Sequence, residues 1–409
     1  MLKISFGNLS KDVLKKVEKV DVSFEGEKLP AFAGYVPDID SIKKKLRKYK
    51  KFKNVILIGN GGSRTSAYVF YHCLEDLRNK TVFEFLTSAE PGLIRRLRRK
   101  YGRKDTLVLI VSKSGDNINA FEPLLSFFDY PVLVVTGGKP NTLSQIAARK
   151  NWEIIIHPEV GGRFSGMTES GLVPACLMGL DIDRVYAGAR SGYKDYGFAA
   201  RQDKNPALIA ARIFNALEGK GYTEIFSSIY SFSLSAFLPL MVQLVHESIG
   251  KDGKGMTIYG DYSPESQHHT NQRIFGGQKN AACLFMYLED YDSRGILRIP
   301  KNISDIEFKG VRLKELEGLK ASETMLYDMQ GVQGNCLSKK IPFISLAVPR
   351  IDAENTGNVM AFWHYLTSEE RLDVGLGLFS TESPRVMKGR PCRYDVRIAN
   401  ASRKAQTVT

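Results

Sequence analysis

Runs of consecutive apolar residues alternate with amphipathic helical patterns through the first half of the chain. Each run is short and rich in β-branched residues. Continuous apolar strands that alternate with helices predict a parallel β-sheet covered by helices on both faces. The predicted strands are 54–58, 106–111, 131–136 and 153–156, and the predicted helices are 41–49, 65–77, one starting near 119, 142–150 and 171–178.

A second series of the same kind begins after residue 200, so the fold class is α/β. Two units of similar plan favour an internal duplication, although no repeat is visible residue by residue. The strands of this series are predicted at 223–230, 282–288 and 342–348, and its helices at 206–219, 237–247, 323–330 and 356–366. We divide the chain into an N-terminal helical or extended segment (1–50), a first domain (51–195), a second domain (196–366) and a C-terminal helical arm (367–409).

Two of the predicted strands end in turns that suit a bound anion. Strand 54–58 runs into 59–63 (GNGGS), and strand 106–111 runs into 112–117 (SKSGDN). Such turns place backbone N–H groups at a helix N-terminus, and ligands of parallel sheets bind at the carboxyl ends of the strands. Either turn alone is as often a tight strand-to-helix connection. Together they predict two turns that converge on one phosphate.

The composition narrows the class of protein. With 409 residues, 43% of them apolar and 25% charged, the chain suits a globular protein of two or three domains. A net charge of +14 is compatible with nucleic acid, a membrane surface or an anionic small ligand. No basic run is interleaved with aromatic residues as a stacking platform would be, so we favour the small anion and expect no nucleic-acid partner.

The sequence contains no stretch typical of a membrane span, and residues 1–16 lack the apolar core of a signal peptide. The five cysteines are far apart, odd in number and without CxxC spacing. They predict neither a disulfide framework nor a zinc site, and they favour a reducing compartment. We therefore expect a cytoplasmic protein without a membrane partner.

Two side chains are candidates for chemistry. Glu247 ends an apolar helix, where a partly desolvated carboxylate suits a general base. Arg163 follows two glycines, which let backbone approach a ligand closely. Each also has an ordinary interpretation, as a helix-end glutamate before a solvated turn and as a plain turn residue. His268 lies in a polar run typical of a surface loop, and His246 faces another side of its helix from Glu247 and is interpreted as structural.

Six motifs in order resemble the glucose-6-phosphate isomerase family, especially its short bacterial and archaeal members, over about 55–388. Segment 59–63 resembles the family's G-I-G-G-S turn, 112–115 its S-K-S/T loop, and 161–165 matches G-G-R-[FY]-S. Segment 247–255 matches E-S-x-G-K-D-G-K-G, His268 follows Glu247 at the family spacing, and 379–388 aligns with the closing F-D-Q-x-G-V-E-x-x-K, with Lys388 in register. The resemblance implies two sugar-isomerase domains, each a parallel sheet between helices.

The resemblance further implies a homodimer whose active site takes its histidine from the neighbouring subunit. The implied reaction converts glucose 6-phosphate and fructose 6-phosphate into each other through ring opening and a cis-enediolate, with no cofactor and no metal. Glu247 would be the base, Arg163 would stabilise the enediolate, and His268 and Lys388 would assist ring opening. The implied substrate and phosphate site consists of Gly62, Ser63, Ser112, Lys113, Ser114, Asn117 and Gly162.

Several positions depart from the family pattern. The usual T-T-x-E is replaced at 116–119, where Asp116 would repel a phosphate unless it faces away or is countered by Lys113. Thr381 replaces the glutamine of the closing motif, and Gly166 and Glu169 are also unusual. These changes leave two alternatives open: a broader isomerase that also accepts mannose 6-phosphate, and a regulator that binds sugar phosphates without turnover.

Overall fold

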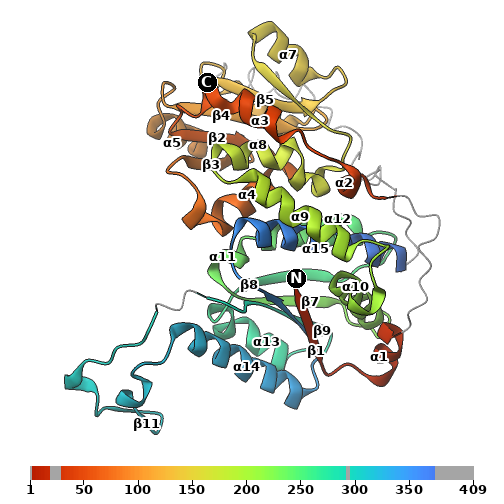
Figure 1. The fold of residues 1–409 in the computed structure, drawn as a ribbon, viewed down its shortest axis with the longest axis vertical. Helices are drawn as coiled ribbons and strands as arrows, with labels where there is room; N and C mark the ends of the chain where they lie inside the picture. Colours follow the sequence, from red (N-terminus) through yellow and green to blue (C-terminus); the bar gives the residue numbers. More distant parts are fainter. Residues whose placement is uncertain (1, 19–28, 292–294, 374–409) are drawn as a thin grey trace, which may run out of the picture.

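The computed structural model describes residues 2–18, 29–291 and 295–373 (Figure 1). One five-stranded sheet has the order β3-β2-β4-β5-β6, and all of its neighbouring strands are parallel. Its strands are β2 (Asn54–Ile58), β3 (Val82–Leu86), β4 (Thr106–Ser112), β5 (Val132–Gly137) and β6 (Glu153–His157). Four of these strands are predicted by the apolar runs. β3 is an addition at the edge of the sheet.

The second five-stranded sheet has the order β1-β12-β9-β7-β8. Its strands are β1 (Lys3–Gly7), β7 (Glu224–Tyr230), β8 (Thr257–Tyr262), β9 (Ala281–Leu288) and β12 (Phe343–Val348). Four strands are parallel, whereas β1 pairs antiparallel with β12, with Lys3 opposite Ala347. An α/β fold with two parallel-sheet units is therefore confirmed. The second sheet has two edge strands that the sequence pattern did not reveal, the antiparallel β1 and the parallel β8.

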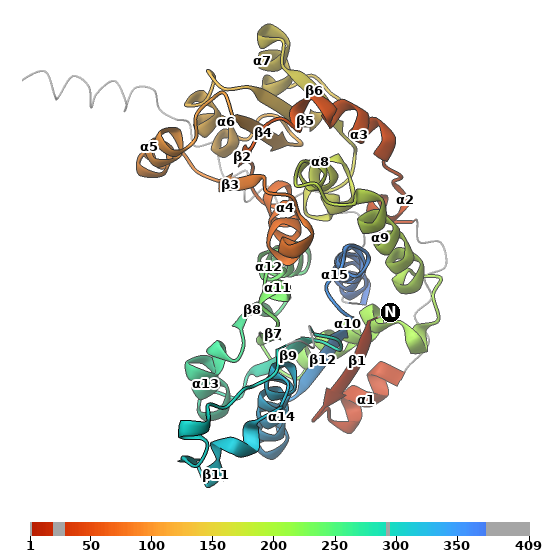
Figure 2. The same cartoon turned by 60° about the vertical axis from the view of Figure 1, so that its left-hand side comes forward.

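Helices form an outer layer on each sheet and a layer between the two sheets (Figure 2). The outer face of the first sheet packs on α5 (Pro91–Lys100), α6 (Ile118–Leu125) and α7 (Thr142–Lys150). The outer face of the second sheet packs on α13 (Thr270–Gly276) and α14 (Ala321–Lys339). The inner layer contains α3 (Ile39–Leu46), α4 (Gly62–Cys73), α8 (Glu169–Leu177), α9 (Ile182–Tyr196), α10 (Pro206–Glu218), α12 (Leu238–Ser248) and α15 (Ala353–Asp373).

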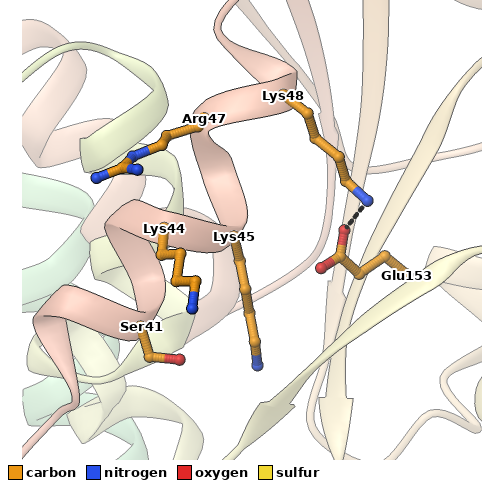
Figure 3. Close-up of a pocket in the computed structure, with 6 residues that line it drawn as sticks. All are labelled: Ser41, Lys44, Lys45, Arg47, Lys48 and Glu153. Atoms are coloured by element: carbon orange, nitrogen blue, oxygen red, sulfur yellow. Dashed lines mark ion pairs between the residues drawn. The ribbon is translucent and has the colours of Figure 1, made fainter.

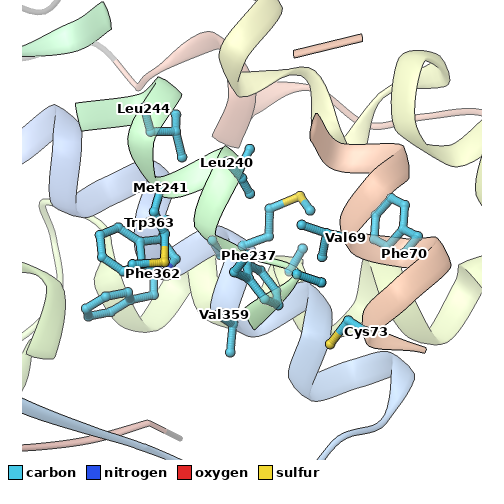
Figure 4. Packing of buried hydrophobic residues seen from close by; sticks show 14 of the residues in the cluster. Val69, Phe70, Cys73, Phe237, Leu240, Met241, Leu244, Val359, Phe362 and Trp363 are labelled. Carbon is cyan, nitrogen blue, oxygen red and sulfur yellow. The ribbon is translucent and has the colours of Figure 1, made fainter. Parts of the chain in front are cut away.

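The inner layer joins the two sheets into one continuous hydrophobic core. Alternate residues along each strand face opposite sides of a sheet, so Leu57 contributes to the inner core and Ile58 to the outer one. In Figure 4, side chains of α4, α12 and α15 meet in this layer, among them Val69, Met241 and Trp363. Since all three are buried, α4 of the first unit and α12 of the second have fixed relative positions.

Helices α9 and α15 approach each other so closely that only glycine fits at their contact. A Cβ atom at Gly188 would lie 1.9 Å from the carbonyl oxygen of Glu354, and one at Gly357 would lie 2.0 Å from that of Val185. Backbone therefore touches backbone across this pair. The predicted helix 356–366 is longer in the structure, where α15 continues to Asp373. Residues 374–409, which include most of the predicted arm with Thr381 and Lys388, lie outside the described residues.

Residues 295–320, which lie between β9 and α14, extend away from the second sheet (Figures 1 and 2). This segment contains the hairpin of β10 (Glu307–Phe308) and β11 (Val311–Arg312), and a bridge between Ile296 and Lys320 closes its base. Apolar side chains on it face solvent, with Ile306 52% and Phe308 60% exposed. We call residues 295–320 the projecting loop.

The remaining short elements connect these layers. None of the helices formed by the described residues is long and apolar enough to cross a membrane. The other helices are α1 (Lys11–Glu18), α2 (Ala31–Gly34), α11 (Phe232–Ser235) and the 3-10 turns η1 (Arg47–Tyr49), η2 (Glu75–Leu77), η3 (Gly162–Met167), η4 (Gln202–Lys204), η5 (Glu265–His268), η6 (Lys301–Ile303) and η7 (Leu313–Leu316).

Candidate active site

The two glycine-bearing turns lie side by side at the carboxyl edge of the first sheet. β2 and β4 are parallel neighbours with Ile58 opposite Ile110, so the turns that follow them leave the sheet at the same edge. A Cβ atom at Gly59 would lie 3.0 Å from the carbonyl oxygen of Val111 and 3.1 Å from the Cβ atom of Ser63. The carboxyl edge of a parallel sheet is where ligands of such folds bind.

The first turn is also pressed against the loop that carries Arg163. Gly61 has a positive φ of 57°, and α4 begins at Gly62. A Cβ atom at Gly62 would lie 1.8 Å from the carbonyl oxygen of Gly162, so only glycine allows this approach. Ser63 lies in the first turn of α4, where backbone N–H groups have no partner within the helix. The positive end of the α4 dipole is therefore directed at the contact between the first turn and the Arg163 loop.

Arg163 is held in a buried position from two sides. Its Nε atom donates a hydrogen bond of 2.8 Å to Oγ of Ser248, and its guanidinium group lies 4.9 Å from the ring centroid of Phe164. The ring of Phe164 in turn stacks on Phe32. Burial lowers the pKa of Arg163, while the nearby carboxylate of Glu247 opposes that shift. A buried cation with a fixed planar fork can stabilise a developing oxyanion.

Glu247 lies in the last turn of α12 between two hydrogen-bond donors. Its Oε1 atom accepts from the guanidinium of Arg163 at 3.4 Å, and its Oε2 atom accepts from Nε2 of Gln243 at 2.9 Å. Oε1 of Gln243 accepts from Oγ1 of Thr65 at 3.0 Å, which ties the pair to α4. The Glu247 side chain is 40% exposed, so its carboxylate is fixed and accessible.

Sequence reasoning missed Gln243. The signal was present, because Gln243 is the only polar residue in the apolar run 237–245 and lies four residues before Glu247. Residues spaced by four lie on the same face of a helix. A side-chain amide in an otherwise apolar helix needs a partner, and the structure shows that the partner is the predicted base.

The second turn provides hydroxyl groups whose protons remain available. Oγ of Ser112 accepts from the backbone N–H of Gly115 at 3.3 Å, and Oγ of Ser114 accepts from that of Asp116 at 3.3 Å. A hydroxyl that accepts one bond can still donate its own proton to an anion. Asn117 caps α6 through its Oδ1 atom. Lys113 pairs with Glu159 at 3.2 Å.

Asp116 does not face the first turn. Its Oδ1 atom accepts a 3.0 Å hydrogen bond from the backbone N–H of Thr142, the first residue of α7. Hydrogen bonding to the side chain of Thr142, and then to its backbone N–H, lowers the pKa of Asp116. α7 covers the outer face of the sheet, whereas α4 covers the inner face. The carboxylate of Asp116 is therefore engaged with the start of α7, and Lys113 does not counter it, since Lys113 pairs with Glu159.

The two unusual residues after the Arg163 loop have structural partners. A Cβ atom at Gly166 would lie 2.2 Å from Sδ of Met360, so glycine allows α15 to approach. The buried carboxylate of Glu169 accepts from the Tyr35 hydroxyl, at 2.7 Å to one oxygen and 2.8 Å to the other. Burial is the main cause that raises the pKa of Tyr35. Both departures from the family pattern are thus accounted for by packing.

The predicted histidine has no direct bond to the predicted base among the described residues. His268 lies at the end of η5 with its side chain in an exposed position. Among the described residues, no hydrogen bond or ion pair joins His268 to Glu247 or Arg163. His246 has the structural role that we expected, because its Nε2 atom accepts from the backbone N–H of Ile258 at 3.0 Å and ties α12 to β8.

The chain is similar to several curated proteins, although no family model matches it. A glucose-6-phosphate isomerase of Methanocaldococcus jannaschii is 28% identical over 302 residues, which is 71% of each chain. One of Enterococcus faecalis is 28% identical over 79% of this chain and 76% of its own. One of Citrifermentans bemidjiense is 30% identical over 58% of this chain, a match that spans about half (48%) of that relative.

Solved structures share the fold. A hypothetical protein of Thermus thermophilus superposes with a TM-score of 0.78 at 20% identity, over 96% of this chain and 94% of its own. A glucose-6-phosphate isomerase of Chlamydia trachomatis superposes with a TM-score of 0.69 at 18% identity, over 90% of this chain and 74% of its own. The sequence comparison confirms the resemblance that the motifs predict, and the solved structures confirm the fold.

Proposed function

The chain resembles the glucose-6-phosphate isomerase family over most of its length, and we propose that it converts glucose 6-phosphate and fructose 6-phosphate into each other. The observation that carries this proposal is the position of Glu247. Its carboxylate lies between Arg163 and Gln243, beside the loop contact of Gly62 and Gly162. An accessible base beside a buried cation suits removal of a proton from a carbon next to a carbonyl group.

In the proposed reaction, ring opening comes first. The C1–O5 bond breaks as O5 gains a proton and O1 loses one, steps that we assign to His268 and Lys388. Glu247 then takes the proton from C2 of the open aldose. The electron pair forms the C1–C2 double bond of the enediolate, whose negative charge Arg163 stabilises. Glu247 returns the proton to C1 while the hydroxyl proton of O2 passes to O1, so that O1 becomes a hydroxyl group and O2 the carbonyl oxygen of the ketose.

We assign phosphate binding to the two neighbouring turns. Ser63 and the adjoining Gly62 would bind it through the N-terminal turn of α4, and Ser112 and Ser114 through their hydroxyl protons. Lys113 would supply a cation to this site. Its ion-pair partner, Glu159, is the more exposed of the two side chains. Asn117 and Gly162 complete the proposed substrate site. The departure at Asp116 is compatible with this assignment, because its carboxylate already accepts a hydrogen bond from the backbone N–H of Thr142.

We further propose a homodimer in which the partner supplies the histidine. Two observations support it. Within one chain, His268 is exposed and makes no hydrogen bond or ion pair with the Glu247 cluster formed by the described residues. The projecting loop also presents Ile306, Phe308 and Val311 to solvent on an extension from the second sheet. Apolar side chains gathered on a projecting hairpin are typical of a subunit contact.

The reaction would belong to glycolysis and gluconeogenesis, and we place the protein in the cytoplasm. The cysteines support a reducing compartment, because Cys73, Cys176, Cys283 and Cys336 are free thiols in the part of the chain that the structure describes.

The direct test measures conversion of fructose 6-phosphate to glucose 6-phosphate by the purified full chain and by the Glu247→Gln variant. General-base catalysis contributes about 10²- to 10⁴-fold, so turnover should fall by that order in the variant. Glu265→Gln, an exposed glutamate on η5, serves as the matched control. Absence of turnover in the parent would overturn the proposal. Turnover of mannose 6-phosphate in the same assay would extend the substrate range.

A further inference from the structure

A basic pocket lies at the opposite edge of the first sheet from the candidate active site. It has a volume of about 450 Å³ and is lined by Ser41, Lys44, Lys45, Arg47, Lys48 and Glu153 (Figure 3). Glu153 is the first residue of β6, so the pocket lies near the amino end of that strand. The glycine-bearing turns follow the carboxyl ends of β2 and β4. The proposed isomerase mechanism therefore makes no use of this pocket.

The helical period gathers these side chains on one face. Ser41, Lys44, Lys45 and Lys48 have the spacing i, i+3, i+4, i+7 along α3 and η1, which places them on a single stripe. Ile42 and Leu46 lie on another face and are buried in the core. In Figure 3, Ser41, Lys44 and Lys45 project to the same side of the helix. Because the two apolar residues are buried in the core, the face of the helix that carries the lysines must point towards the pocket.

The pocket contains more positive charge than its one carboxylate neutralises. Glu153 accepts from Lys48 at 2.7 Å and from the Tyr49 hydroxyl at 2.9 Å. Among the ion pairs formed by the described residues, none includes Lys44, Lys45 or Arg47. Like charges that are neighbours on a helix face destabilise the helix. A bound anion would remove that repulsion.

We propose that this pocket binds a small anion that carries at least two phosphate groups. Three unpaired cations match the charge of a diphosphate better than that of a single phosphate, and the Ser41 hydroxyl adds a neutral donor. No aromatic side chain lines the pocket, so the stacking surface that single-stranded nucleic acid needs is missing there. The proposal does not depend on the isomerase activity.

Inorganic pyrophosphate is the probe. Its binding to the full chain is measured by titration calorimetry at low ionic strength, with and without saturating fructose 6-phosphate. The Lys44→Gln/Lys45→Gln variant removes two cations from the pocket. The Lys50→Gln/Lys53→Gln variant removes the same charge from neighbours that do not line it. None of these four lysines is buried, so both variants should fold.

We expect one pyrophosphate per chain, unaffected by fructose 6-phosphate. Loss of two charge-assisted contacts should weaken binding about tenfold or more in the pocket variant, with little change in the control. Equal weakening in both variants would overturn the proposal in favour of a diffuse positive field. Displacement by fructose 6-phosphate would overturn it by placing the anion in the active site. Binding of a short DNA duplex but not of pyrophosphate would overturn it in favour of nucleic acid. Binding of neither would also overturn it, and would leave the lysines as partners of the helix dipole alone.

Discussion

Gln243 and Glu247 lie one turn apart on α12, and Nε2 of Gln243 donates a 2.9 Å hydrogen bond to Oε2 of Glu247. The amide is itself oriented, because its oxygen accepts from Oγ1 of Thr65. A carboxylate held by donors on both oxygens keeps one orientation, so the geometry of proton abstraction is set before substrate binds.

This relationship predicts that Gln243→Met lowers kcat more than it changes KM. The variant keeps the length of the side chain but removes the donor. A hydrogen bond to a charged group contributes about 1.5–3 kcal/mol, so kcat should fall about tenfold to a hundredfold. Steady-state kinetics on fructose 6-phosphate measures both constants. Thr65→Val should produce a smaller fall, and Thr65→Ser should restore most of it. A Gln243→Met enzyme with parental kcat would refute the positioning role.

The contact of Gly62 with Gly162 predicts that one added methyl group at residue 62 sharply lowers turnover. Gly62→Ala would place its Cβ atom 1.8 Å from a carbonyl oxygen, so α4 and the Arg163 loop must move apart. Shifts of about 1 Å at a reacting centre can cost on the order of a hundredfold in rate. We expect at least that loss of turnover. Gly102→Ala is the matched control, since a Cβ atom there meets nothing within 4 Å.

Circular dichroism and thermal unfolding would show whether the Gly62→Ala chain still folds. A variant that remains folded and fully active would show that the two loops need not touch for catalysis.

A shared active site predicts that two inactive subunits can form an active hybrid. Glu247→Gln and His268→Ala chains, co-expressed with different affinity tags, are purified as hybrid dimers. If each site combines Glu247 of one subunit with His268 of the other, a hybrid contains one intact site and should show about half the parental activity. Each variant alone should be inactive. A hybrid without activity would indicate that both residues act within one chain.

The burial of His364 predicts that the protein loses stability in acid. It is buried between Phe32, Phe164 and Tyr193, and burial lowers its pKa to about 3. Below the ordinary histidine pKa of about 6.5, the unfolded chain binds a proton that the folded chain does not. The free energy of unfolding should therefore fall as pH drops from about 6.5 towards 3, by up to about 1.4 kcal/mol per pH unit from this group.

Urea unfolding at several pH values measures this slope. His364→Gln should flatten the slope between pH values of about 6.5 and 5, whatever its effect on stability at neutral pH. His269→Gln, an exposed histidine near Asp261, should leave the slope close to that of the parent. An unchanged slope in the His364 variant would assign the acid sensitivity to other groups.

The sequence predicts best those elements whose pattern is set by their own burial. β2 and α7 have the bounds that were predicted, because every residue of β2 after Asn54 is buried and α7 begins at a side-chain cap on Asn141. β3 was missed because an edge strand is half-exposed, with Glu84 among its phenylalanines. β1 and β8 were missed for the same reason, since both are edge strands of the second sheet and most of their residues are exposed or only partly buried.

The residues of the candidate site also fall into those that the sequence indicated and those that only the structure revealed. The motifs indicated Glu247 and Arg163, and the structure brings these two together. Gln243 became evident only through its partners, although its place as the single polar residue of the run 237–245 was a signal that could have found it. The direction of Asp116 depended on where α7 begins relative to the second turn, which is a tertiary relationship. Local pattern identifies residue types, whereas side-chain direction follows from packing.

The pairing of β1 with β12 affects how the chain is assembled on the ribosome. Strand Lys3–Gly7 is synthesised long before the strand that it borders, Phe343–Val348. α15, which completes the layer between the sheets, is made later still. β1 must therefore wait, with its partner missing, while the residues between the two strands are translated. Contacts so distant in sequence slow folding, and an unpaired strand that waits is a site for association with other chains.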